Sequence, residues 1–193
     1  MTPNILKNPI VRSAFNWFAN IALFLMRWKV KGQLPDKKKF IMIAAPHSSN
    51  WDFIFFMLVV FKFKMPIHWM GKHTMFAWPF GWILKRLGGI PIDRSIKTDT
   101  VQVMVDVFAK TKDFILTIAP SGTRSKTKKW KSGFYHIANQ SKVPIVCGYI
   151  DYKNKVTGFG PTFIPTNDIE SDMITIKKFY QPFSARPELS NSD

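Results

Sequence analysis

The sequence predicts a single α/β domain in which helices flank a largely parallel central sheet. Three short, continuous apolar runs are typical of strands buried on both faces of such a sheet. They cover residues 40–45, 114–119 and 143–150. Helical patterns alternate with these runs, as parallel strands and their connecting helices do. The chain of 193 residues has no internal repeat, so we expect one domain at residues 31–181, followed by a flexible Pro- and Ser-rich tail at 182–193.

The chain opens on an apolar stretch that carries no charged residue from Ser13 to Met26. This stretch is shorter than the roughly 20 residues that a membrane span requires. Basic residues, rather than the small residues of a signal-peptide cleavage site, follow it. The pattern favours an uncleaved helix lying in a membrane interface over an ordinary buried helix. We therefore expect residues 1–30 to form a membrane-associating helix, whose lipid contacts are made by Trp17, Phe18, Phe24 and Trp28.

The first buried strand leads into a helix. Pro46 and His47 end the run at residues 40–45, and the next three residues are all favourable helix N-caps. The pattern predicts a helix over residues 51–62, and residues 67–70 are a further candidate strand.

Three more helices are expected further along the chain. Residues 98–110 have apolar side chains at helical spacing, with Thr98 as the expected cap, and residues 132–141 predict a short helix. Asn167 and Glu170 form a capping-box pattern that predicts a helix reaching Tyr180.

Residues 68–87 combine many aromatic side chains with lysine and arginine. Two interpretations fit this composition equally well. One is a core loop that contains a short helix, and the other is a second membrane contact through Trp78 and Trp82.

The chain is strongly basic, with 28 Lys and Arg against 12 Asp and Glu and a net charge of +16. This excess indicates a polyanionic partner, and a hydrophobic content of 46% excludes a disordered chain. An aromatic content of 15% favours an anionic membrane surface over nucleic acid, whose binding signatures are absent. A basic module that binds membranes or nucleic acid without catalysis is kept as an alternative, because lysines surround Trp130.

Metal and disulfide chemistry are not expected. Cys147 is the single cysteine, which excludes an internal disulfide and a cysteine-rich zinc site. His68, His73 and His136 lack the spacing of metal ligands, so we predict no metal site.

His47 and Asp52 are the sharpest candidates for catalysis. His47 follows a buried strand, and Asp52 lies in the first turn of the next helix, so the carboxylate can fold back toward the imidazole. A carboxylate on one ring nitrogen fixes the tautomer and makes the other nitrogen a better base. A capping aspartate near a structural histidine would give the same spacing, and for the pair alone we favour that interpretation.

Two arginines follow predicted strand ends. Arg94 comes after the segment from Gly88, and Arg124 lies in the turn after the strand that ends at Pro120. Ligands of open α/β sheets bind beyond the carboxyl ends of the strands, where these arginines can meet His47. Two arginines in such a place suit a phosphate group.

The order and spacing of these segments resemble the glycerolipid acyltransferases, typified by lysophosphatidic acid acyltransferase. The first motif of that family is a His and an Asp separated by four residues, as in His47 and Asp52. The other three motifs follow in order at Gly89–Arg94, at Pro120, Gly122, Thr123, Arg124 and Ser125, and at residues 143–146.

The resemblance implies a membrane-associated enzyme of phospholipid biosynthesis that uses no cofactor. His47 would be the general base and Asp52 its orienting partner. The substrate-binding residues would be Arg94, Ser121, Gly122, Thr123 and Arg124. The acyl donor would be acyl-CoA or acyl-carrier protein, and the acceptor a lysophospholipid, foremost lysophosphatidic acid. The enzyme would lie peripherally on the cytoplasmic side of the inner membrane.

The chain departs from the family at Ser121, where a glutamate is usual. In the family this glutamate helps to position the acceptor, so the resemblance implies that the change alters acceptor choice or weakens activity. It also raises the alternative of a lipid or thioester hydrolase with Ser121 as nucleophile. Ser121 is not in a Gly-x-Ser-x-Gly elbow, which argues against that alternative.

Overall fold

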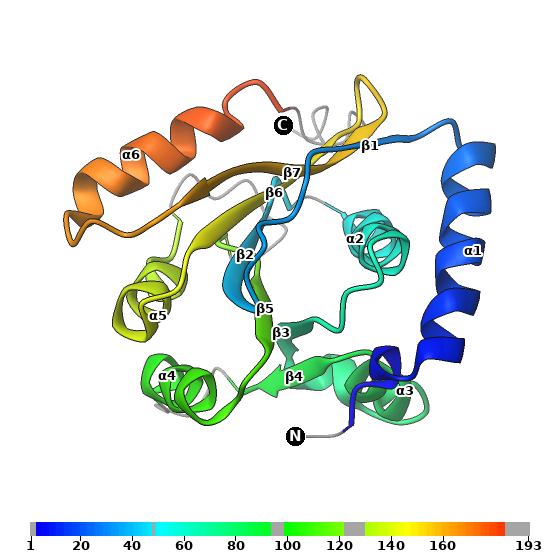
Figure 1. The fold of residues 1–193 in the computed structure, drawn as a ribbon, viewed down its shortest axis with the longest axis horizontal. Coiled ribbons are helices and arrows are strands. Elements are labelled where there is room, and N and C mark those ends of the chain that lie inside the picture. Colours follow the sequence, from blue (N-terminus) through cyan, green and yellow to red (C-terminus); the bar gives the residue numbers. More distant parts are fainter. Residues whose placement is uncertain (1–2, 48, 94–98, 122–129, 184–193) are drawn as a thin grey trace.

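The computed structural model describes residues 3–47, 49–93, 99–121 and 130–183 (Figure 1). Seven strands form one sheet in the order β1-β7-β6-β2-β5-β3-β4. The strands are β1 (Lys29–Lys31), β2 (Lys39–Ala45), β3 (His68–Lys72), β4 (Gly89–Ile92), β5 (Phe114–Ile118), β6 (Ile145–Asp151) and β7 (Val156–Phe163). Strands β2 to β6 are mutually parallel, and β7 pairs antiparallel to β6. The predicted α/β class with a largely parallel sheet is confirmed.

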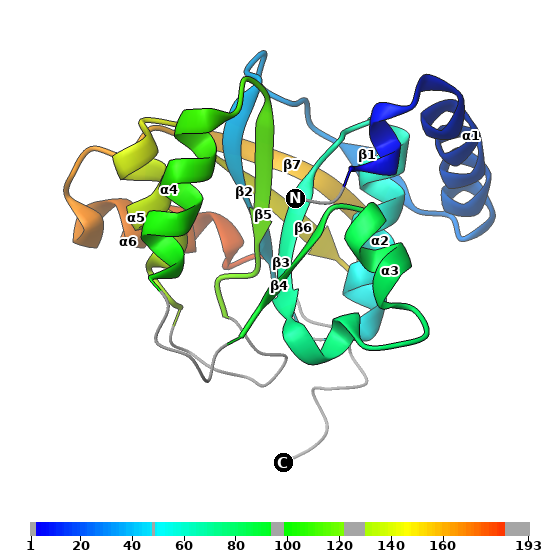
Figure 2. The same ribbon diagram turned by 90° about the horizontal axis from the view of Figure 1, so that it is seen from below.

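Helices cover both faces of the sheet (Figures 1 and 2). Helices α1, α2 and α3 lie on one side, and α4, α5 and α6 lie on the other. The helices are α1 (Pro9–Leu25), α2 (Asn50–Lys62), α3 (Gly81–Arg86), α4 (Thr100–Lys110), α5 (Gly133–Ser141) and α6 (Ile169–Tyr180), with short 3₁₀ turns η1 (Ile5–Lys7) and η2 (His73–Phe76).

The central strand β2 explains the two-sided core. Phe40 and Met42 pack in the cluster under α1 and α2, whereas Ile41 and Ile43 pack in the cluster under α4, α5 and α6. Successive side chains of a strand point to opposite faces, so a continuous apolar run buries both faces at once. The same reasoning predicted β5 and β6, and both are strands.

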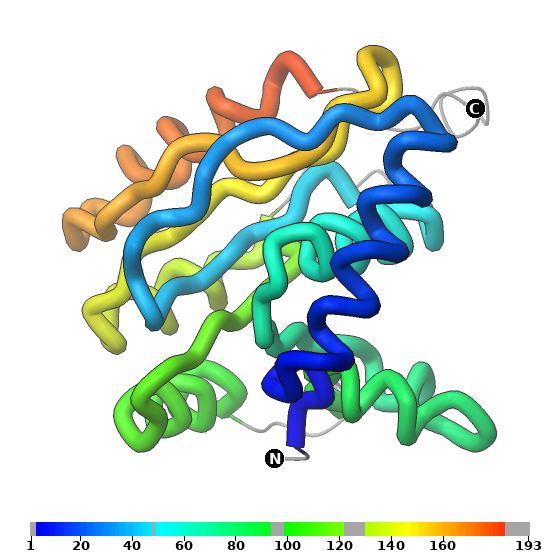
Figure 3. Tube along the Cα trace, turned by 45° about the vertical axis from the view of Figure 1, so that its right-hand side comes forward, coloured from blue at the N-terminus to red at the C-terminus, as the bar shows by residue number. Residues whose placement is uncertain are grey.

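Helix α1 packs along α2 (Figure 3). The side-chain amide of Asn16 donates to the carbonyl of Lys62, and the Lys62 ammonium donates to Asn20. The helix is shorter than the predicted segment of residues 1–30 and begins at Pro9, because Asn8 caps it and Pro9 suits the first helical position. None of the helices in the described part of the chain combines the length and the apolar character that crossing a membrane demands.

Strands β1 and β7 were not predicted. Strand β7 contains Gly158, Gly160 and Pro161, residue types that are depleted in strands. Gly158 has a φ of +145°, and a Cβ there would lie 1.9 Å from the carbonyl oxygen of Lys31. Strand β7 therefore forms because it pairs with β6 and β1, and its local sequence pattern does not predict a strand.

Two predicted helix caps differ from the structure. Helix α6 is capped by Asp168, which accepts from the Ser171 amide, so the capping box predicted at Asn167 and Glu170 was wrong. Helix α4 is capped by Asp99, and the expected cap Thr98 lies outside the described residues. The expected tail at residues 182–193 lies outside them from residue 184 onward.

Candidate active site

The carboxyl ends of the parallel strands bring the candidate residues to one edge of the sheet. His47 follows β2, Lys72 ends β3, and Ser121 comes three residues after β5. Because β2 lies between β5 and β6, His47 occupies the middle of this edge. The carboxyl ends of these strands thus lie at one edge, where open α/β sheets bind ligands. The predicted convergence of Arg94 and Arg124 with His47 concerns residues outside the described part of the chain.

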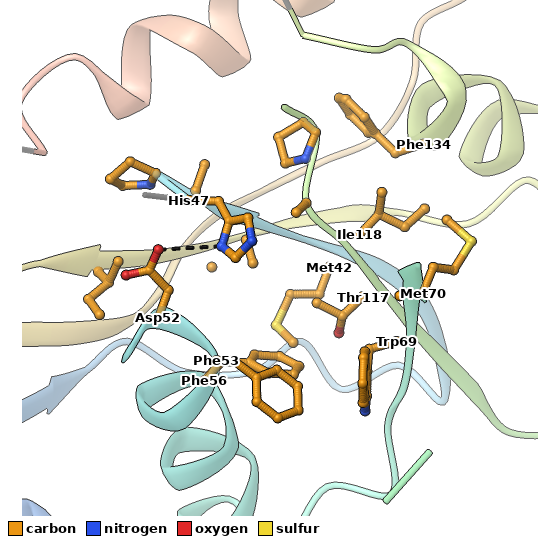
Figure 4. A pocket seen from close by; sticks show the side chains of 18 of the residues that line it. Met42, His47, Asp52, Phe53, Phe56, Trp69, Met70, Thr117, Ile118 and Phe134 are labelled. Atoms are coloured by element: carbon orange, nitrogen blue, oxygen red, sulfur yellow. Dashed lines mark ion pairs between the residues drawn. The ribbon is translucent and has the colours of Figure 1, made fainter. Parts of the chain in front are cut away.

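His47 and Asp52 face each other (Figure 4). The Nδ1 atom of His47 lies 3.4 Å from Oδ2 of Asp52, and the side chains are 26% and 7% exposed. A carboxylate at Nδ1 favours the tautomer that carries the proton there, which leaves Nε2 with a free lone pair. The arrangement therefore fits a general base that is oriented by a buried carboxylate.

The helix cap holds Asp52 in place. The backbone amide of Ser49 donates to Oδ2 of Asp52 at 2.7 Å, and the Ser49 hydroxyl accepts from the Trp51 amide at 3.2 Å. This capping box satisfies backbone groups at the start of α2. The first turn of α2 thus fixes the carboxylate that faces His47, so capping and catalysis are compatible uses of Asp52.

Tyr152 was missed by the sequence reasoning. Its hydroxyl donates to Oδ1 of Asp52 at 2.5 Å, across 100 residues of sequence. Tyr152 directly follows β6, whose carboxyl end lies beside that of β2. The strand-end rule that pointed to His47 could have found it.

A cavity of about 1050 Å³ adjoins His47 and Asp52 (Figure 4). Its floor is formed by Met42, Thr117 and Trp69, which are neighbours in strand register. Phe53 and Phe56 of α2 line it as well. Such an apolar space, with polar groups at one end, is suited to a hydrocarbon chain whose reactive group lies at His47.

Two lysines also line the cavity. They are Lys72, at the end of β3, and Lys131, just before α5, and both side chains are exposed. Next to Lys72 in the chain is His73, whose Nδ1 lies 3.6 Å from Oδ1 of Asp93. The lysines give the cavity cationic groups at the carboxyl edge of the sheet, and the sequence reasoning had not singled them out as ligands.

Four of the predicted substrate-binding residues lie outside the described residues: Arg94, Gly122, Thr123 and Arg124. Ser121 is described and half-buried, next to Pro120, which lines the cavity. Its role as a substrate-binding residue stays a prediction.

Five of the six residues predicted to contact a membrane have large exposed areas. Trp78 is 91% exposed, Phe24 80% and Trp17 70%, and Phe18 and Trp82 are also exposed. They lie on α1, on α3 and just before α3. Trp28 differs, because it is half-buried and its ring packs against Phe55 at a centroid distance of 4.0 Å.

Cys147 is buried in β6, and burial raises the pKa of its thiol to about 12. A neutral, inaccessible thiol is a poor nucleophile. Among the described residues, no group of His, Cys, Asp and Glu side chains is arranged to hold a metal ion.

Curated proteins resemble part of the chain. A 1-acyl-sn-glycerol-3-phosphate acyltransferase of Streptococcus pneumoniae (strain ATCC BAA-255 / R6) is 28% identical over 131 residues, which are 63% of this chain and 48% of that protein. The enzyme of the same name from Saccharomyces cerevisiae (strain ATCC 204508 / S288c) is 33% identical over 119 residues, which are 57% and 38% of the two chains. This chain therefore spans about half, or less, of the length of these relatives.

A solved structure shares the fold. It is the crystal structure of the 1-acyl-sn-glycerophosphate (LPA) acyltransferase PlsC from Thermotoga maritima, with a TM-score of 0.58 and 17% sequence identity. The match covers 91% of this chain and 82% of the other.

The model of the family described as Acyltransferase matches residues 27–151. The match contains His47 and Asp52 and extends from β1 to the end of β6, so it includes the mutually parallel strands β2 to β6. Because it also covers more than half of the sequence, the family resemblance drawn from the motifs is confirmed, and this chain belongs to the Acyltransferase family.

Proposed function

We propose that this chain is a membrane-associated O-acyltransferase that moves a fatty acyl group from a thioester to the hydroxyl of a lysophospholipid, foremost lysophosphatidic acid. The observation that carries the proposal is the His47–Asp52 pair at the mouth of a large apolar cavity. The relatives whose printed names specify 1-acyl-sn-glycerol-3-phosphate support this acceptor.

The chemistry needs one base and no covalent enzyme intermediate. The Asp52 carboxylate beside Nδ1 favours the proton on that nitrogen, so Nε2 can take the proton of the acceptor hydroxyl. The hydroxyl oxygen then attacks the thioester carbon. As the new ester C–O bond forms, the C–S bond breaks, and the proton passes from Nε2 to the leaving thiolate. The products are a diacyl lipid and free CoA or carrier thiol.

The cavity and its lysines support the two substrates. The aromatic and aliphatic lining around Phe53, Phe56 and Trp69 suits the acyl chain of the donor. Lys72 and Lys131 are cations that can contact the phosphates of the acceptor or of CoA. By the family motifs, Arg94 and Arg124 complete the phosphate site, and Ser121 modifies its selectivity.

Membrane association is the second part of the proposal. Exposed aromatic side chains on α1 and around α3 lie on the same side of the sheet as α2, whose first turn carries Asp52. Aromatic side chains are favoured at membrane interfaces, and the net charge of +16 favours an anionic surface. We propose peripheral binding to the cytoplasmic face of an inner membrane.

The test is acyl transfer from labelled acyl-CoA to lysophosphatidic acid in mixed micelles. We expect phosphatidic acid from the native chain and none from His47→Ala. His136→Ala is the matched control, because His136 is exposed on α5 and does not line the cavity. A carrier-protein donor is assayed in parallel.

Ser121→Glu and Ser121→Ala separate the alternatives. A higher transfer rate in Ser121→Glu would mark Ser121 as a weakened form of the usual family site. Hydrolysis of acyl-CoA without any acceptor, lost in Ser121→Ala, would instead identify a hydrolase. If the native protein and Ser121→Glu are both folded and neither transfers an acyl group from either donor, lysophosphatidic acid is rejected as the acceptor.

A further inference from the structure

We propose that Tyr152 is a positioning residue for the His47–Asp52 pair. Its hydroxyl holds the Asp52 carboxylate in the orientation in which Oδ2 faces Nδ1 of His47. The proposal rests on the acyl-transfer function proposed above and assigns a third side chain to that mechanism.

The sheet brings Tyr152 to the site. Strands β2 and β6 are parallel neighbours in which Ala45 pairs with Tyr149. Beyond this pair the chain leaves β2 at once, whereas β6 continues to Asp151 along β7. His47 lies two residues beyond Ala45, and Tyr152 lies three residues beyond Tyr149. Asp52, in the first turn of α2, is in contact with both.

Both carboxylate oxygens of Asp52 are fixed, and by different partners. Oδ1 accepts from the Tyr152 hydroxyl, while Oδ2 accepts from the Ser49 amide and faces His47. The terminal torsion of an aspartate is broad, so a carboxylate held at one oxygen can rotate. The second contact, at Oδ1, restricts this rotation and keeps Oδ2 directed at the imidazole.

The phenol ring of Tyr152 is itself held by packing. It makes edge contacts with Trp28 at a centroid distance of 5.4 Å and with Phe55 at 5.9 Å. Phe55 belongs to α2, and Trp28 lies between α1 and β1. A hydroxyl on a ring packed between two elements is a well-defined donor, whereas one on a mobile ring would orient the carboxylate poorly.

The variant that tests this role is Tyr152→Phe, which keeps the ring contacts and removes the hydroxyl. We expect kcat to fall by roughly 10- to 100-fold, because small displacements of catalytic groups have effects of this size. KM should stay within about twofold, since the hydroxyl donates to Asp52 and Tyr152 does not line the cavity. A Tyr152→Phe enzyme with native kcat would overturn the proposal.

The matched control is Tyr135→Phe. The Tyr135 hydroxyl donates to Oδ2 of Asp172 at 2.8 Å, so this variant removes the same type of hydrogen bond between α5 and α6. It leaves His47 and Asp52 untouched, and we expect an unchanged kcat. An equal loss of kcat in both variants would indicate a general effect on the fold and overturn the proposal.

A double-mutant cycle asks whether Tyr152 acts through Asp52. In an Asp52→Asn background, Tyr152→Phe should have little further effect on kcat, because the carboxylate that it positions is gone. If the kcat losses of the two single variants multiply in the double variant, Tyr152 acts independently of Asp52.

A measurement without substrate separates this proposal from the proposed function. Nitrogen-15 chemical shifts of the imidazoles, with the His47 signals assigned by their loss in His47→Gln, report which ring nitrogen carries the proton. In the native enzyme we expect the neutral His47 imidazole to carry its proton on Nδ1. In Tyr152→Phe we expect a larger population of the tautomer that carries the proton on Nε2.

If acyl transfer fails but this shift is seen, the positioning role stands and the proposed function falls. If Tyr152→Phe leaves the tautomer populations of His47 unchanged, the positioning role is overturned, whatever the enzyme does.

Discussion

Asp52 contacts His47 through the same oxygen that closes the N-terminal cap of α2. Oδ2 accepts from the Ser49 amide at 2.7 Å and lies 3.4 Å from Nδ1 of His47. The position of the carboxylate is therefore set by helix initiation, which is a local event. One residue serves the fold and the proposed chemistry together.

This relationship predicts the behaviour of Asp52→Asn. Asparagine can still accept from the Ser49 amide, but its neutral side chain neither stabilises an imidazolium nor enforces the Nδ1–H tautomer. We expect kcat to fall by about 10³-fold or more in the acyl-transfer assay. The far-UV circular dichroism spectrum, which reports the fold, should be unchanged. Asp106→Asn, at an exposed position on α4, should retain full activity. Equal activity of Asp52→Asn and native enzyme would contradict the proposed role.

The exposed aromatic side chains of α1 predict a membrane-binding defect. The double variant Trp17→Ser, Phe24→Ser should bind anionic liposomes several-fold more weakly in a sedimentation assay, because it removes two large apolar anchors. Ile174→Ser is the control, since Ile174 is also highly exposed but lies on α6, on the other side of the sheet. Equal loss in both variants would argue against α1 as the docking element.

Two buried threonines predict opposite effects of one substitution. Thr117 and Thr157 are each 4% exposed. Within the described residues, the Thr117 hydroxyl has no hydrogen-bond partner, whereas the Thr157 hydroxyl donates to the carbonyl of Tyr149 at 2.8 Å.

Thr117→Val should therefore raise the free energy of unfolding by about 1 kcal/mol, and Thr157→Val should lower it by about 1 kcal/mol. Urea denaturation measures both. A loss of stability in Thr117→Val would show that its hydroxyl does have a stabilising partner.

The buried His68 should make folding stability sensitive to acid. Burial, with smaller contributions from Lys7 and the N-terminus, lowers the pKa of His68 to about 4. The unfolded chain takes up this proton near the usual pKa of about 6.5, so between pH 6.5 and 4 the unfolded state binds more protons. Folding stability should therefore fall as the pH drops through this window.

The variant His68→Phe should weaken that dependence. The His68 ring already packs against Phe114 at a centroid distance of 4.9 Å, so a phenyl ring suits the site. Urea unfolding at pH 7.5 and pH 5 compares the two proteins. The same loss of stability in both between these pH values would assign the effect to other groups.

Local patterns were enough to predict much of the fold. The apolar runs that form β2, β5 and β6 are buried on both faces. A strand buried on both faces is a continuous apolar run in the sequence, so it can be recognised directly. The spacing of His47 and Asp52 was equally informative, because five residues of strand end and helix start form one local unit.

Contacts between distant residues could not be predicted in this way. Tyr152 reaches Asp52 only because β6 lies beside β2 in the sheet, and β7 becomes a strand only because two neighbours supply its hydrogen bonds. The cavity floor likewise joins Met42, Thr117 and Trp69 from three strands. Local sequence encodes turns, caps and the burial of each segment. Strand order and register depend on the packing of the whole chain, and they determine which side chains meet.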